Sequence, residues 1–122
     1  MFRNTVILLI VAMLTTSCAR LGEWMFAQFN AQAMEDLSLE EQSVLSGDHR
    51  VSYFFRDGIS PVVLLHGFTA DKSMYFDLID ELGEERGLIV PDLPGHGTTT
   101  GPESFTYTAE EMARIVVRLV RL

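Results

Sequence analysis

The sequence predicts an α/β fold with a mostly parallel sheet, because short apolar runs alternate with segments of helical periodicity. Three segments carry this prediction: a β-rich stretch that begins near position 50, a strand–helix–strand pattern over residues 62–92, and an amphipathic helix that begins after Thr108. A hydrophobic content of 48% against 21% charged residues is typical of a globular domain and not of a disordered chain.

The first 17 residues have the layout of a signal peptide. Arg3 precedes a nearly all-apolar run over Thr5–Leu14, and small polar residues follow the run. A helix needs about 20 apolar residues to cross a bilayer, so a run this short disfavours a permanent membrane span. We therefore predict that residues 1–17 are a cleaved signal of the lipoprotein type.

Cys18 is the only cysteine and follows directly after Ser17, with Leu14 four positions upstream. This pattern resembles a bacterial lipobox, which implies cleavage before Cys18 and lipid attachment to its thiol; two or three acyl chains anchor firmly where one binds marginally. We expect a lipid-anchored protein of the bacterial cell envelope, at the outer membrane. The alternative is an ordinary cleaved signal with an incidental cysteine, which would give a periplasmic or secreted protein.

Residues 18–47 are predicted to form a helix and a linker next to the anchor, and residues 48–122 the start of a folded domain. Apolar side chains recur at helical spacing in the first part, and acidic residues follow them. The apolar positions are Leu21, Trp24, Met25 and Phe29.

The domain itself begins with strand signals. Val51–Phe55 is aromatic and β-rich and is closed by a turn at Asp57-Gly58. Val62–Leu65 is a continuous apolar run, which suits a strand buried on both faces of a sheet. Helical periodicity over residues 75–82 and a further apolar run over residues 87–92 then predict a parallel β-α-β crossover.

The last segment has the signals of a helix start. Thr108 followed three residues later by Glu111 forms a capping box, and an apolar stripe continues from there. The stripe consists of Met112, Ile115, Val116, Leu119 and Val120.

The loop His66-Gly67-Phe68 follows the carboxyl end of the apolar strand, where open α/β sheets bind their ligands. Gly67 lets the backbone turn sharply and brings the amide of Phe68 to face the space above the sheet. An amide in that place can bind an oxyanion, and the loss of one such donor costs about 3 kcal/mol in acyl transfer.

These segments together resemble the α/β-hydrolase superfamily, and within it bacterial lipases and esterases with lipid-anchored N-termini. The resemblance is carried by Val62–Phe68 with the following Ala70-Asp71-Lys72, and by Ile89–Gly97. It implies an α/β-hydrolase fold of which this chain holds the N-terminal strands and first helices. It also implies that Phe68 supplies an oxyanion-hole amide, that His66 and Gly67 shape its loop, and that residues 92–97 form a wall of the active-site mouth.

The family's nucleophile elbow, G-x-S-x-G, is absent, and so are the acid and the histidine that follow it. Ser60 lies before the apolar strand and lacks the second glycine of that motif. We expect the elbow beyond Leu122, and we expect the 122 residues alone to be inactive.

The resemblance implies hydrolysis of a small-molecule or lipid carboxylic ester through a serine acyl-enzyme. Two alternatives stay open. One is another chemistry of the superfamily, namely epoxide, haloalkane or carbon–carbon bond hydrolysis. The other is a non-catalytic, membrane-tethered binding module.

Other ligand classes are disfavoured by the sequence. A net charge of −8 and the lack of a basic cluster argue against nucleic acid. His66 and His96 lie in loops above one sheet edge but show none of the close ligand spacing of zinc sites. The segment Gly95–Gly101 lacks a P-loop lysine and the third glycine of a dinucleotide fingerprint. We therefore expect no metal and no cofactor.

Overall fold

The computed structural model describes the backbone of residues 2–121 and the side chains of residues 19–121. The chain divides into two compact units, one up to Ala33 and one from Met34 onward. The first consists of the helix α1, Phe2–Asp36, whose last turn belongs to the second unit. The backbone of Cys18 lies in α1, whereas its side chain is outside the described residues. Over the described part of the chain, no helix is long and apolar enough to cross a membrane.

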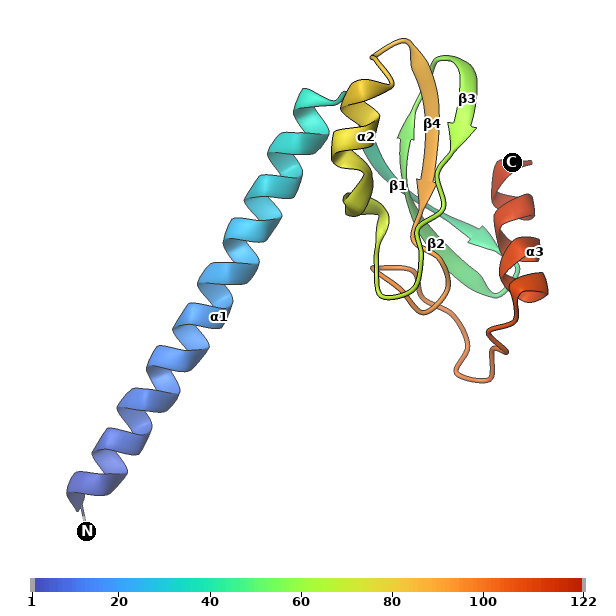
Figure 1. Ribbon diagram of the computed structural model, residues 1–122. Helices are drawn as coiled ribbons and strands as arrows, with labels where there is room; N and C mark the ends of the chain where they lie inside the picture. The colour runs from blue at the N-terminus through green and yellow to red at the C-terminus, as the bar shows by residue number, and fades with distance from the viewer. Residues whose placement is uncertain (1, 122) are drawn as a thin grey trace. The chain divides into compact units, whose positions relative to one another are not determined.

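The second unit is built on a four-stranded sheet in the order β1-β2-β4-β3 (Figure 1). The strands are β1 Glu40–Ser46, β2 His49–Arg56, β3 Ile59–Val63 and β4 Arg86–Pro91. β1 and β2 form an antiparallel hairpin, β2 pairs antiparallel with β4, and β3 pairs parallel with β4. The predicted parallel crossover is therefore confirmed, and the described sheet as a whole is mixed.

Helices cover both faces of this sheet (Figure 1). On one face lie the 3-10 helix η1, Lys72–Tyr75, and the helix α2, Phe76–Glu81, whose Phe76 ring stacks on Phe54 of β2 at 5.5 Å between centroids. On the other face lies α3, Ala109–Val120, whose Ile115 and Leu119 form a buried core with Val51. The alternating side chains of β2 thus supply the core on both faces.

Two sequence-based predictions about this unit need correction. Residues 40–46, predicted as linker, form β1, because their backbone pairs along its whole length with β2. The strand predicted at residues 62–65 begins and ends earlier, at Ile59 and Val63, and is not buried on both faces: Val62 and Val63 are half-buried and Leu65 is exposed. β3 is one of the two edge strands of the described sheet and has a paired neighbour on only one side.

The predicted cap of the last helix is confirmed in part. The Thr108 hydroxyl accepts a hydrogen bond from the Glu111 amide at 3.2 Å, as a capping box requires. The Glu111 carboxylate, however, binds Arg114 at 2.6 Å, and the Thr108 amide donates to the carbonyl of Thr106. Half of the capping box therefore forms, which is enough to fix where α3 begins.

Candidate active site

The parallel strands β3 and β4 point toward the same end of the sheet, and the loops that follow them meet there (Figure 1). The loop after β3 contains His66, Gly67 and Phe68, which the sequence singled out. The loop after β4 contains Asp92 and His96. Loops at the carboxyl ends of parallel strands are where this class of sheet binds ligands, so the structure brings the predicted residues to the predicted place.

His66 connects the two loops. Its Nε2 accepts a hydrogen bond from the Leu93 amide at 2.9 Å, and its Nδ1 lies 2.8 Å from the carbonyl oxygen of Gly67. Because Nε2 accepts, the proton of the neutral ring is on Nδ1, which donates to Gly67. Both ring nitrogens are therefore engaged within the protein, and His66 has no lone pair to offer a metal or a proton-transfer step. Its role is to hold the loop.

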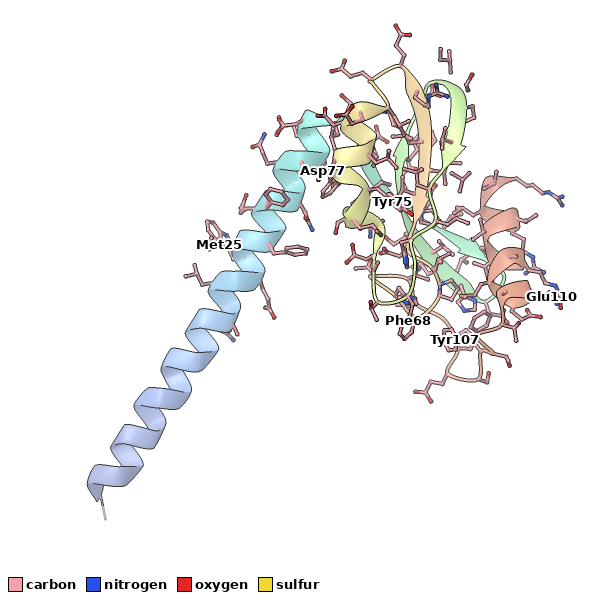
Figure 2. The ribbon with its side chains drawn as sticks, in the orientation of Figure 1. Met25, Phe68, Tyr75, Asp77, Tyr107 and Glu110 are labelled. Carbon is pink, nitrogen blue, oxygen red and sulfur yellow. The ribbon has the colours of Figure 1, made fainter. Side chains whose placement is uncertain are left out.

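Phe68 lies at the tip of this loop, with a side chain that is 90% exposed (Figure 2). Its ring approaches that of His96 at 6.2 Å between centroids, and His96 in turn contacts the His66 ring at 5.0 Å. Among the described residues, the amide of Phe68 has no hydrogen-bond partner in the protein. A backbone donor at the end of a sheet is thus left available to a ligand.

The backbone of the loop turns at a different residue from the one expected. Gly67 does not have a positive φ, and a Cβ at this position would meet no atom within 4 Å. The left-handed residue is Thr69, with φ 64°. Gly67 therefore leaves open space beside the Phe68 amide and is not required for the turn itself.

Asp92 is the charged residue at the centre of the site, and it is fully buried at 0% exposure. Its Oδ1 accepts from the Lys72 amide at 2.8 Å; its Oδ2 accepts from Lys72 Nζ at 2.6 Å and from the Thr98 amide at 2.9 Å. Burial raises the pKa of this carboxyl, but the hydrogen bonds from Lys72 and Thr98 and the charge of Lys72 outweigh it, so the pKa of Asp92 lies below its ordinary value.

Sequence reasoning missed this ion pair. The sequence motifs put Asp92 in a wall of the site and give Lys72 no role, whereas in the fold the two residues form one buried ion pair. One signal was present in the sequence: Lys72 is the only lysine of the chain. Lys72 follows the His66–Phe68 loop, and Asp92 follows the next apolar run 20 residues later. These two positions could have indicated the pair.

Comparisons with known proteins agree with this architecture. The family model described as the alpha/beta hydrolase fold matches residues 60–122. Lipase 3 of Moraxella sp. (strain TA144) is 33% identical over 84 residues, which cover 67% of this chain and 26% of that lipase.

Solved structures extend the likeness. The epoxide hydrolase CorEH is 28% identical, with a TM-score of 0.63, over 68% of this chain and 29% of that protein. A bacterial membrane phospholipase A shares the fold at 23% identity, with a TM-score of 0.76, over 99% of this chain and 40% of that protein. The chain thus spans about a quarter of the lipase and less than half of either solved protein. Since the family match covers just over half of its residues, the chain belongs to the α/β-hydrolase fold family.

Proposed function

We propose that these residues form the oxyanion side of a serine hydrolase that acts on carboxylic esters. The observation that carries the proposal is the Phe68 amide, which has no protein partner among the described residues and lies in a loop at the carboxyl end of β3. An oxyanion hole needs a donor that is fixed before the reaction begins. The similarity to Lipase 3 favours an ester as the substrate.

The proposal requires a nucleophile from outside these 122 residues. No G-x-S-x-G elbow occurs within the 122 residues, and in this family the acid and the histidine come after the elbow in chain order. In the proposed reaction the serine attacks the ester carbonyl, the histidine takes the serine proton, and the negative charge that grows on the carbonyl oxygen is bound by the Phe68 amide.

Labelling with a fluorophosphonate tests the proposal on the complete enzyme. We expect one serine to be labelled covalently, and the rate of hydrolysis of short-chain acyl esters to fall in proportion to the fraction of enzyme labelled. Heat-unfolded enzyme serves as the control and should stay unlabelled. An enzyme that hydrolyses esters without any labelled serine, or that has no ester activity, would contradict the proposal.

Epoxide hydrolysis is the second candidate, favoured by the 28% identity to the epoxide hydrolase CorEH. The two candidates differ in the nucleophile, because an aspartate at the elbow attacks an epoxide whereas a serine attacks an ester. An enzyme that resists fluorophosphonate and opens epoxides would therefore select this candidate over the ester hydrolase.

We further propose that Cys18 is the lipid attachment site and that the acyl chains hold the protein on the bacterial envelope. The support is the sequence alone: an apolar run that ends in Ser17-Cys18. Cells fed labelled palmitate should give a labelled mature protein, and Cys18→Ser should abolish the label. A mature parent protein without label, beginning at a residue other than Cys18, would disprove the anchor.

A further inference from the structure

The only lysine of the chain is buried. Lys72 is 6% exposed, and its Nζ lies 5.1 Å from the centroid of the Phe54 ring. Lysine is almost never buried to this extent without a charged partner, since removing an ammonium group from water is costly. Here the partners are Asp92 at 2.6 Å and the half-exposed Glu41 at 3.0 Å, with the Thr98 hydroxyl at 3.2 Å.

Lys72 is also one end of the loop that carries the candidate oxyanion donor. At the other end, His66 is held by the Leu93 amide, and Lys72 is held by Asp92 through both its backbone amide and its side chain. Asp92 and Leu93 are consecutive residues that directly follow β4. The five-residue span 67–71, which contains Phe68, is therefore flanked by two residues, His66 and Lys72, that both bind the segment directly after β4.

The Asp92 carboxylate accepts hydrogen bonds from two loops. Asp92 binds Lys72 from the loop after β3 and the Thr98 amide from the loop after β4. The second loop is shaped to fit the carboxylate: Gly97 has φ 51°, and a Cβ there would collide with the Asp92 carboxyl group. Because Asp92 binds both loops, its ion pair with Lys72 fixes the distance between them.

We propose that Lys72 is a positioning residue for catalysis: its ion pair with Asp92 fixes the His66–Lys72 loop so that the Phe68 amide faces the reacting carbonyl oxygen. This inference rests on the proposed ester hydrolase. Lys72 touches no substrate and acts through the loop. A donor must be in place before the charge develops, and a displacement of about 1 Å at a reacting group can lower the rate about 100-fold.

The test compares Lys72→Met with Arg114→Met in the complete enzyme. Both changes remove one cation from an ion pair, but Arg114 is exposed and binds Glu110 and Glu111 on the surface of α3. Titration with fluorophosphonate counts competent sites, so that kcat refers to folded enzyme only. We expect Lys72→Met to lower kcat per site about 10- to 100-fold with KM nearly unchanged, and Arg114→Met to match the parent.

Parental kcat per site in Lys72→Met, at whatever stability, would overturn the proposal, because a merely structural pair changes the number of folded molecules and not their turnover. Lys72→Arg, which keeps the charge with a larger head group, should recover part of kcat. If Lys72→Met does not fold, Lys72→Gln is the deciding variant: it keeps a neutral hydrogen-bond donor but removes the charge that pairs with Asp92, and it should lower kcat at constant KM. A parental kcat in that variant would likewise overturn the proposal.

Hydrogen exchange separates this inference from the proposed function. If the parent shows no ester turnover, the proposed function fails, yet the loop can still be examined directly. Amides of residues 67–71 should then exchange faster in Lys72→Met than in Arg114→Met if Lys72 fixes the loop. Equal exchange in the two variants would refute the positioning role independently of any reaction.

Discussion

Phe68→Pro in the complete enzyme should lower kcat for ester hydrolysis about 100- to 1,000-fold, because proline removes the backbone N–H that is expected to bind the oxyanion. KM should change much less, since this hydrogen bond strengthens mainly in the transition state. Steady-state kinetics on a short-chain acyl ester gives both constants. No other single change in the described residues is expected to affect turnover as strongly.

Phe68→Leu is the matched control, because it keeps the amide and changes only a side chain that is 90% exposed. Its kcat should stay close to that of the parent. Proline also restricts the residue before it, so Phe68→Pro is informative only if its thermal unfolding resembles that of the parent. A well-folded proline variant with near-parental kcat would mean that this loop is structural and that the oxyanion donor lies elsewhere.

Asp92→Ala should lower the free energy of unfolding by about 3–5 kcal/mol, because it leaves Lys72 buried without its closest carboxylate. Glu110→Ala is the comparison: Glu110 also forms an ion pair at 2.6 Å but is exposed, and such pairs contribute about 0–1 kcal/mol. Chemical denaturation of both variants measures the difference. If both variants lose the same free energy of unfolding, the buried Lys72–Asp92 pair contributes no more to stability than the exposed pair of Glu110.

The pair also predicts how stability depends on pH. The pKa of Asp92 is lower in the folded protein than in the unfolded chain, so its contribution is complete above the unfolded value of about 4 and is lost as the pH falls through the folded value. Between neutral pH and pH 5 the pair should therefore contribute fully. Below about pH 4 the difference between the parent and Asp92→Ala should shrink; a difference that grows in acid would contradict the assignment.

The elements that sequence predicted correctly are those with a strong local signal. Thr108 caps the start of α3 because its hydroxyl accepts a hydrogen bond from an amide of the first turn, which is a local interaction. The strand–helix–strand order of residues 59–91 follows from hydrophobic periodicity. β1 carries no such signal, since Glu40–Ser46 has few β-branched residues and becomes a strand only by pairing with β2. Its conformation depends on tertiary contact.

In the site, too, local features could be predicted from the sequence and tertiary contacts could not. The loop His66–Phe68 could be located because a strand end and a glycine are local features. The burial of Lys72 could not, because it depends on Glu41 and Asp92, which lie on other elements. Gly97 is similar: in sequence it belongs to a glycine-rich segment to which no role could be assigned, whereas in the fold its missing side chain makes room for the Asp92 carboxylate.

A crystal structure of the complete enzyme inhibited by a phosphonate ester tests the oxyanion role of Phe68 most directly. The phosphonyl oxygen takes the place of the charged carbonyl oxygen of the tetrahedral intermediate. We predict that this oxygen accepts a hydrogen bond from the Phe68 amide at about 2.7–3.1 Å, with the loop still held by His66–Leu93 and Lys72–Asp92. A phosphonyl oxygen bound by other donors, with the Phe68 amide turned away from it, would contradict the account.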